Sequence, residues 1–430
     1  MRQRWPMFAL VAVVSFLCGG WLLQRGAAAD GATYHQARLL DDVLSRVARD
    51  YVDSIPEAKL YDQAAQGMLE QLHDPYSVLL EGKDFDQLEE ATTGNYAGLG
   101  IQMDVRNGWI TVVAPLPDSP ADRAGIATGD QLVELDGRST EGWTSDEAVR
   151  RLRGPAGSTV RLGVRRPGES RIRQYTIVRA EIHVRSVPPG TLFDHGVGYL
   201  SLTTVSDSSA AELAAAVDSL RGRGMHGLIL DLRNNPGGLL TQGIRVADLF
   251  LDPGQGIVST RGRAPGSTQS FTDHKPELWP GMPVVVLVND GTASAAEIIA
   301  GALQDHDRAL VVGTPTFGKG LVQTLYPLDD HTALKITTAR WYTPSGRLIQ
   351  RVAKDEEDQA RIAADLAVGR ADSAATADTA GPVYHTDAGR VVRGGGGIRP
   401  DVIVHADSTT ADDRRFLKAL GDHFGAFRDA

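Results

Sequence analysis

The sequence predicts an α/β multidomain protein with a helical N-terminal arm, a β-rich domain with short helices, and a core of β/α repeats. Apolar residues recur at helical spacing between residues 34 and 94, whereas short β-type runs separated by turns fill residues 95–180. From residue 181 to about 350, apolar runs typical of buried strands alternate with helical patterns. A chain of 430 residues is also too long for one ordinary domain, so two or three domains are expected.

The composition excludes several classes of function. Hydrophobic residues make up 42% and charged residues 23%, as in ordinary soluble globular proteins. A formal net charge of -10, with no basic run, argues against a nucleic-acid partner. Cys18 is the one cysteine, which rules out an intramolecular disulfide, and neither a Cys/His metal spacing nor an HExxH motif occurs. We therefore expect no metal and no cofactor.

Residues 1–29 have the pattern of an export segment. Arg2 and Arg4 precede an apolar stretch from Trp5 to Leu23, which is long enough to span a bilayer marginally. The small residues Ala27–Ala29 equally fit the exit of a cleaved signal peptide. A signal peptide and a membrane anchor both stay open. In either case the body is expected outside the cytoplasm, either periplasmic or anchored to the membrane.

The helical arm follows the export segment. Leu40, Leu44 and Val47 recur at helical spacing, and a second run of the same period follows. His73-Asp74-Pro75-Tyr76-Ser77 interrupts the pattern, because proline disfavours helix in the residue before it. Helical residues are predicted as far as residue 90. The arm is expected either to form a homo-oligomer with a second copy or to pack as a collar.

Residues 95–180 resemble a PDZ domain. The block Ser119–Ile126, followed by Gly129-Asp130, lies between short strands downstream of the tetrapeptide Gly98-Leu99-Gly100-Ile101. In PDZ domains this loop turns backbone N–H groups toward the terminal carboxylate of a peptide, which adds as a strand to a sheet edge. We therefore expect these four residues to bind the C-terminal tails of proteins or peptides.

The core, residues 181–350, contains a serine and a lysine that are candidates for a catalytic dyad. The apolar run Val284–Val288 predicts a buried strand, a turn follows, and a helix is predicted to begin near Ser294. A later Gly-rich loop carries Lys319. The loop after another predicted strand contains Gly237, whose backbone can take a positive φ and expose its amide.

Ser294 taken alone is most simply a helix-cap serine. A catalytic serine needs a base within hydrogen-bond reach. His306 lies at the far end of the same predicted helix, so we assign it a structural role. Lys319 is one of only seven lysines and lies between glycines, and burial there would lower its pKa and supply a neutral amine. The helix start and the Gly237 loop would then supply N–H donors for an oxyanion.

The core contains three distinctive blocks: Asn235–Gly238, Thr292–Ile298 and Phe317–Gln323. They resemble the signatures of the C-terminal processing (tail-specific) serine peptidases, and the preceding PDZ domain matches the layout of that family. By that resemblance Ser294 is the nucleophile, Lys319 the general base and Gln323 the residue that orients the lysine. Gly237 and Ala295 are implied as backbone oxyanion donors, and the core is implied to be crotonase-like. Gln323 follows Lys319 by four residues, so the two side chains share a face in either a helix or a strand.

The C-terminal part divides into two segments. Residues 351–393 form a charged and Ala-rich insertion, predicted to contain a helix from Lys354 to Leu366 and to be partly disordered. Residues 394–430 are predicted to return to the core and to end in a helix from Ala411 to Phe424, capped by Thr410.

The favoured hypothesis is an exported serine endopeptidase that cuts substrates near their C-termini, with the PDZ domain binding the tail and regulating access. The alternative is a non-catalytic PDZ adaptor with a protease-like scaffold, and the intact set of Ser294, Lys319 and Gln323 argues against it. A crotonase-like enzyme acting on acyl thioesters is a third hypothesis, which the export segment and PDZ domain disfavour. An activating adaptor stays open as a further partner.

Overall fold

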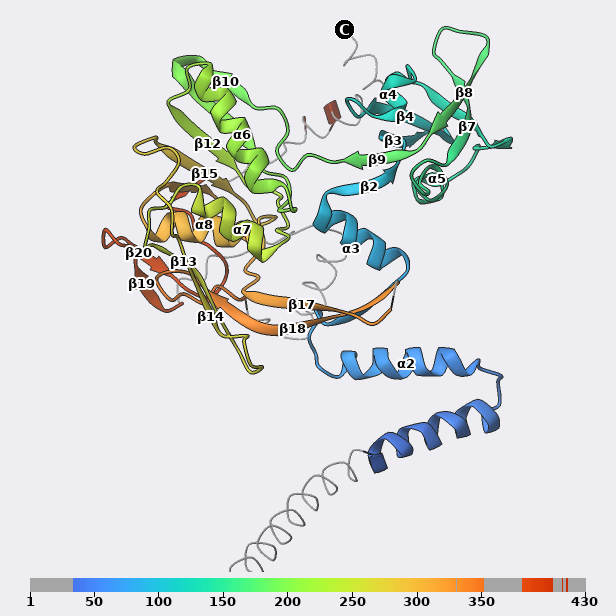
Figure 1. The fold of residues 1–430 in the computed structure, drawn as a ribbon, viewed down its shortest axis with the longest axis horizontal. Coiled ribbons are helices and arrows are strands. Elements are labelled where there is room, and N and C mark those ends of the chain that lie inside the picture. Colours follow the sequence, from blue (N-terminus) through green and yellow to red (C-terminus); the bar gives the residue numbers. More distant parts are fainter. Residues whose placement is uncertain (1–33, 330, 352–380, 405–411, 413–414, 417–430) are drawn as a thin grey trace, which may run out of the picture. The chain divides into compact units, whose positions relative to one another are not determined.

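The computed structural model describes residues 34–329, 331–351, 381–404, 412 and 415–416. It divides into two compact units, residues 1–80 with 333–336 and residues 81–332 with 337–430 (Figure 1). The predicted export segment, most of the insertion and most of the final helix lie outside the described residues. Within the described ranges, no helix is both long enough and apolar enough to cross a bilayer.

The first unit contains the helical arm. One helix spans residues 34–50, and α2 (Glu57–Glu70) follows it. The prediction of helix up to residue 90 was wrong at β1 (Val78–Glu81), a strand that pairs with β18 (Thr332–Tyr342). This pairing joins segments far apart in the chain, so local periodicity does not encode it. Beyond β1 the prediction of helix holds for α3 (Lys83–Thr93).

The PDZ domain is an antiparallel sheet in the order β3-β4-β5-β7-β8, with β6 paired to β5. Side chains that alternate inward along these strands form a core of their own, including Ile110, Leu132 and Val160. Both of its short helices begin at side-chain caps, Ser119 for α4 and Thr144 for α5. Its elements are β3 (Ile101–Arg106), β4 (Trp109–Pro115), α4 (Pro120–Arg123), β5 (Gln131–Leu135), β6 (Arg138–Ser139), α5 (Ser145–Leu152), β7 (Thr159–Arg165) and β8 (Ile172–Val178). A separate pair, β2 (Asn95–Gly98) and β9 (Ala180–His183), joins its two chain ends.

The core is built on a six-stranded sheet in the order β10-β11-β12-β15-β16-β21. All neighbours along it are parallel except β10 and β11. Parallel strands are buried on both faces, which explains the continuous apolar run of Val284–Val288. The strands are β10 (Thr191–Phe193), β11 (Val197–Ser201), β12 (Gly227–Asp231), β15 (Val284–Val288), β16 (Leu310–Gly313) and β21 (Val402–Ile403). Pairing of β21 with β16 confirms that the chain returns to the core after the insertion.

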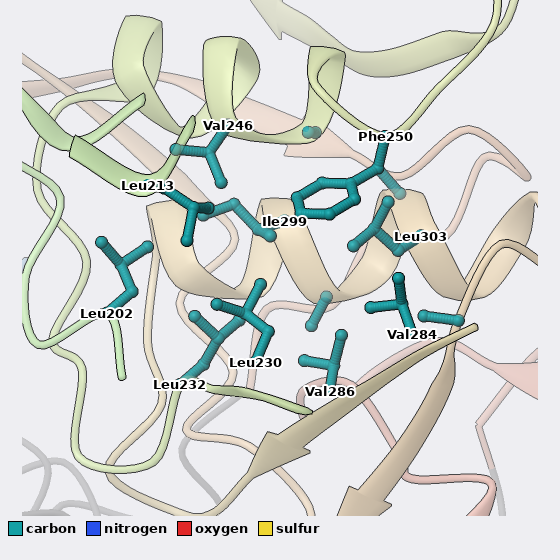
Figure 2. Packing of buried hydrophobic residues seen from close by; sticks show 14 of the residues in the cluster. Leu202, Leu213, Leu230, Leu232, Val246, Phe250, Val284, Val286, Ile299 and Leu303 are labelled. Atoms are coloured by element: carbon teal, nitrogen blue, oxygen red, sulfur yellow. The ribbon is translucent and has the colours of Figure 1, made fainter. Parts of the chain in front are cut away.

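Helix α8 (Ala295–Asp305) is the centre of the packing around this sheet. Every one of its residues is buried, and the polar ones, Glu297, Gln304 and Asp305, are hydrogen-bonded there. Ile299 and Leu303 lie among side chains from β12, β15 and the two other helices (Figure 2). Those helices are α6 (Ser209–Gly222) and α7 (Leu240–Asp248). Because α8 is enclosed on every side, the residue at its start is held in a fixed position.

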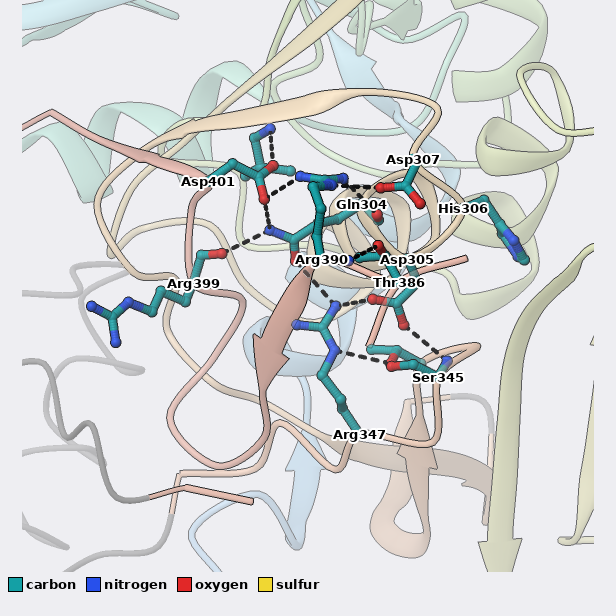
Figure 3. A network of polar contacts seen from close by, with 12 residues as sticks. Gln304, Asp305, His306, Asp307, Ser345, Arg347, Thr386, Arg390, Arg399 and Asp401 are labelled. Atoms are coloured by element: carbon teal, nitrogen blue, oxygen red, sulfur yellow. Dashed lines mark hydrogen bonds and ion pairs between the residues drawn. The ribbon is translucent and has the colours of Figure 1, made fainter. Parts of the chain in front are cut away.

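The remaining strands form smaller sheets. Strand β18 pairs with β13 on one side and with β17 on the other. Strand β13 in turn forms a hairpin with β14. A separate hairpin of β19 and β20 lies within the region predicted as an insertion, so this part is ordered structure. Arg347 and Arg390 bring carboxylates at the end of α8 and in the segment after β20 into one polar network (Figure 3). The bounds are β13 (Gly256–Gly262), β14 (Gln269–Thr272), β17 (Leu321–Pro327), β19 (Val383–His385) and β20 (Val391–Arg393).

Candidate active site

Ser294 lies at the junction between the turn after β15 and the first residue of α8. Its backbone has φ +54° and ψ -118°, whereas an ordinary helix cap is extended. A non-glycine residue with positive φ is strained, and such strain concentrates at functional sites. The position of Ser294 therefore fits the cap interpretation, but its conformation calls for a further role.

Glu297 joins the serine to the lysine loop. Its carboxylate is fully buried, and its Oε2 atom accepts hydrogen bonds from the backbone amides of both Ser294 (2.8 Å) and Lys319 (2.9 Å). The distance between the two amide nitrogens therefore cannot exceed the sum of these two hydrogen-bond lengths. The other oxygen, Oε1, accepts from the Gly318 amide at 2.7 Å and from the Thr316 hydroxyl at 2.5 Å.

Burial raises the pKa of Glu297 above its ordinary value, while the hydrogen bonds from Thr316, Lys319, Gly318 and Ser294 act in the opposite direction. Four donors satisfy both oxygens of this side chain, which makes the burial of a carboxyl group tolerable. Sequence reasoning did not assign Glu297. The sequence signal for Glu297 is the Ser-x-x-Glu spacing of a capping box. In the structure the Glu297 carboxylate accepts the Ser294 amide, as in that motif.

Lys319 lies in the loop between β16 and β17, and its side chain is half-buried. The loop has no regular secondary structure, so its shape depends on bonds to its surroundings. The Lys319 carbonyl accepts from Trp341 Nε1 at 3.0 Å, and the Phe317 amide donates to the Thr292 carbonyl at 3.0 Å. Together with Glu297, these bonds place the lysine backbone beside the start of α8.

Gln323 lies on β17, four residues after Lys319. The segment is extended, so of the two geometries that the sequence left open, the strand is the one present. Gln323 Nε2 donates to Thr337 Oγ1 at 3.4 Å, which orients the amide. With the nitrogen directed at Thr337, the amide oxygen is the atom suited to accept from an amine.

Gly237 approaches Ser294 so closely that a side chain would not fit. A Cβ atom built on it would lie 2.6 Å from the Ala293 carbonyl oxygen, 2.8 Å from the Ala295 amide nitrogen and 2.8 Å from Ser294 Cβ. Its φ of +88° also favours glycine. The Ala293 amide donates to the Asn235 carbonyl at 2.9 Å, which fixes this loop against the serine.

The two predicted oxyanion donors differ in the structure. Ala295 is the first residue of α8, where backbone N–H groups have no partner within the helix. The Gly237 amide donates to Asn235 Oδ1 at 2.8 Å, so in this conformation it is directed away from an oxyanion. The role of Gly237 as a donor stays a prediction that requires a rotation of its peptide.

His306 is confirmed as structural. It is the residue that ends α8, with Nδ1 bonded to Asp387 (2.7 Å) and Nε2 to the Gly256 carbonyl (2.6 Å). Helix α8 has 11 residues, so its two ends lie well apart.

In the PDZ domain, Gly98, Leu99, Gly100 and Ile101 line a pocket. Leu99 is buried in the domain core, and a Cβ on Gly100 (φ +74°) would meet Ser119 Cβ at 2.3 Å. The loop therefore runs tightly against the start of α4, as a close backbone approach requires. The rest of the lining is mostly apolar and comes from β3, α5 and their flanks: Tyr96, Met103, Val149, Leu152 and Arg153.

Models of known protein families match three parts of the chain. The model of peptidase family S41 matches residues 196–358, a PDZ model matches residues 111–166, and the model of the activating protease CtpB N-terminal domain matches residues 23–83. A carboxy-terminal-processing protease of Bartonella bacilliformis is 41% identical over 324 residues, which are 74% of each chain. The chain belongs to peptidase family S41.

Further relatives extend this result. The S41 peptidase is 38% identical over 361 residues to the carboxy-terminal processing protease CtpA of Bacillus subtilis, covering 82% of this chain and 76% of the relative. A solved photosystem II D1 C-terminal processing protease is 32% identical, with 71% of this chain and 82% of that chain covered and a TM-score of 0.40. The peptidase is thus a serine-type hydrolase with a PDZ domain, as the signature blocks predicted.

Proposed function

We propose that this peptidase is an exported serine endopeptidase that cleaves proteins or peptides near their C-termini with a Ser294–Lys319 dyad. The observation that carries the proposal is that the backbone amides of Ser294 and Lys319 both donate to one oxygen of Glu297. A purely structural loop has no need of an ionisable residue whose backbone is held beside a strained serine. The non-catalytic adaptor hypothesis leaves both features without a purpose.

In the proposed reaction, the neutral Lys319 amine takes the proton of the Ser294 hydroxyl as Oγ attacks the scissile carbonyl carbon. The Ala295 amide stabilises the oxyanion, and the Gly237 amide joins it after its peptide has rotated. The tetrahedral intermediate collapses to an acyl-enzyme, and the leaving amine receives the proton from the Lys319 ammonium. Lys319 then takes a proton from a water molecule that attacks the ester, and its ammonium returns this proton to Ser294 Oγ as the acid product leaves. Gln323 holds the lysine amine in line for each transfer.

The PDZ pocket is proposed to bind the substrate tail and to regulate access to the dyad. Amides of Leu99, Gly100 and Ile101 would receive the terminal carboxylate, and the side chains of Met103 and Val149 would contact an apolar last residue. An activating adaptor that offers a similar tail would compete for the same pocket.

The first unit is proposed to form a homo-oligomer. Several large apolar side chains of the arm are exposed, among them Leu39 (58%), Val43 (50%) and Met68 (64%), and a second copy would cover them. Sedimentation of the purified protein at the monomer mass would exclude this. Export to the periplasm or to the outer face of the membrane is proposed from residues 1–29, and recovery in the cytoplasmic fraction would exclude it.

The test of the dyad compares wild-type protein with Ser294→Ala on an unfolded protein that ends in an apolar tail. We expect a loss of at least about 10³-fold in kcat, because no other hydroxyl replaces the nucleophile. Ser267→Ala, in the hairpin of β13 and β14, is the matched control and should cut normally. Equal cutting by Ser294→Ala would refute the dyad.

A further inference from the structure

The loop that carries Lys319 is bonded to helix α8, which begins after Ser294, and also to a second segment. On the side of α8, Glu297 accepts the Gly318 and Lys319 amides. On the other side lies the returning chain, residues 394–398, which follows the hairpin of β19 and β20. Thr316 forms side-chain hydrogen bonds with both.

Thr316 and Ile398 are both fully buried, and two hydrogen bonds join them. The Thr316 amide donates to the Ile398 carbonyl at 3.1 Å, and the Ile398 amide donates to Thr316 Oγ1 at 2.6 Å. The same Oγ1 lies 2.5 Å from Glu297 Oε1. Since the hydroxyl has one proton and accepts from Ile398, its proton goes to the carboxylate. The result is a directed chain of bonds from Ile398 through Thr316 to Glu297.

Glycines make this contact close. Gly397 has φ +88°, and a Cβ on it would lie 2.4 Å from the Thr316 carbonyl oxygen. A Cβ on Gly318 would lie 2.9 Å from the Gly397 amide nitrogen. The two segments are therefore in direct backbone contact, so a shift of the returning chain moves the loop.

The returning chain is itself anchored at the far end of α8. Gln304 Nε2 donates to the Arg399 carbonyl at 2.8 Å and to Asp401 Oδ1 at 3.1 Å (Figure 3). Asp401 Oδ2 accepts the Val311 amide at 2.8 Å. Residues 398–401 thus connect Gln304, near the end of α8, with Thr316, which is bonded to Glu297 near the start of α8.

We propose that Thr316 is a positioning residue. Through its bond to Glu297, it makes the position of the catalytic lysine depend on the position of the returning chain. The hydroxyl keeps the Glu297 carboxylate in the place where its other oxygen binds the Ser294 and Lys319 amides. Without it, Glu297 loses a donor and Ile398 loses an acceptor, both in a fully buried site. The inference rests on the proposed Ser294–Lys319 dyad.

The test replaces Thr316 by valine, which keeps the shape and removes the hydroxyl. We expect kcat to fall by about tenfold to 10²-fold, because small displacements of a catalytic group have effects of this size, while KM changes by less than about twofold. Thr316→Ser restores the hydroxyl and should recover kcat to within about threefold of wild type. If Thr316→Val does not fold, Thr316→Ala against Thr316→Ser isolates the same hydroxyl.

The matched control is Thr260→Val. Thr260 is also buried, and its Oγ1 likewise donates one hydrogen bond, here to the Ser267 carbonyl (2.8 Å), and accepts one from a backbone amide, that of Gln269 (3.2 Å). It should leave kcat unchanged. Wild-type kcat in Thr316→Val, or a loss in Thr316→Ser as large as in Thr316→Val, would overturn the inference. Ser294→Ala is measured in parallel: if it still cuts, the dyad itself has failed, and if it is inactive while Thr316→Val is normal, only the role of Thr316 has failed.

Discussion

The candidate catalytic centre and the candidate carboxylate loop of the PDZ domain both contain a glycine with positive φ, but they are assembled in different ways. In the PDZ domain, four consecutive residues, Gly98–Ile101, supply the whole candidate carboxylate site. In the core, Ser294, Lys319 and Gly237 come from three separate loops, and Glu297 holds two of them together. A contiguous loop depends mainly on its own backbone. The candidate catalytic centre depends on a buried carboxyl group and on the residues that position this group.

The largest effect that separates the two regions is expected from Lys319→Arg. The charge is kept, but guanidinium does not give up its proton, so a loss of about 10²–10⁴-fold in kcat is expected. Steady-state kinetics on the tailed substrate measures it. Lys275→Arg, at an exposed loop position, should be normal. Turnover near wild type in Lys319→Arg would exclude a role as base.

A second large effect is expected from Gly237→Ala. The added Cβ would meet the Ala293 and Ala295 backbone and Ser294 Cβ, so the nucleophile is displaced and kcat falls by about 10²-fold. Gly254→Ala is the control, since its φ of +94° carries the same backbone strain while nothing lies within 4 Å of the new Cβ. Equal activity of the two variants would show that the close approach of Gly237 is irrelevant to catalysis.

The smallest effect is expected at the PDZ pocket, from Val149→Asp. A carboxylate in the lining repels the terminal carboxylate of the tail, so KM should rise by about tenfold, or about 1.4 kcal/mol of binding, with little change in kcat. Arg150→Ala, on the same helix α5, changes the net charge by the same amount at an exposed position. A change in kcat alone would mean that the domain gates the dyad without delivering the tail.

Much of the fold followed from local pattern. The continuous apolar run of β15, the helical spacing of α8 and the short strands of the PDZ domain each predicted their element. The strand β1 and the hairpin of β19 and β20 were not predicted as strands, because their pairing partners, not their own composition, make them so. Lys319 was singled out by its residue type and flanking glycines, and Ser294 by its place at the predicted start of a helix after a buried strand and a turn.

The contacts inside the site were beyond such reasoning. Glu297 was seen only as part of a signature block, and Thr316 as a residue of a Gly-rich loop. Their roles depend on the parallel neighbours β15 and β16, whose carboxyl ends bring the starts of the two following loops to one edge of the sheet, and on the segment that precedes β21. The state of the Gly237 amide, bonded to Asn235, depends on a side-chain rotamer that sequence does not specify.

The sequence by itself therefore determined most of the element types and the family, and it singled out Ser294 and Lys319 as candidates, because periodicity, turn residues and signature blocks are local properties. Only the tertiary structure decided that the backbone amides of Ser294 and Lys319 share one oxygen of Glu297, and that Ile398 of the returning chain reaches the other oxygen through Thr316. The longest of those contacts joins residues 82 positions apart (316 to 398), and burial and strand pairing, not local preference, bring them together.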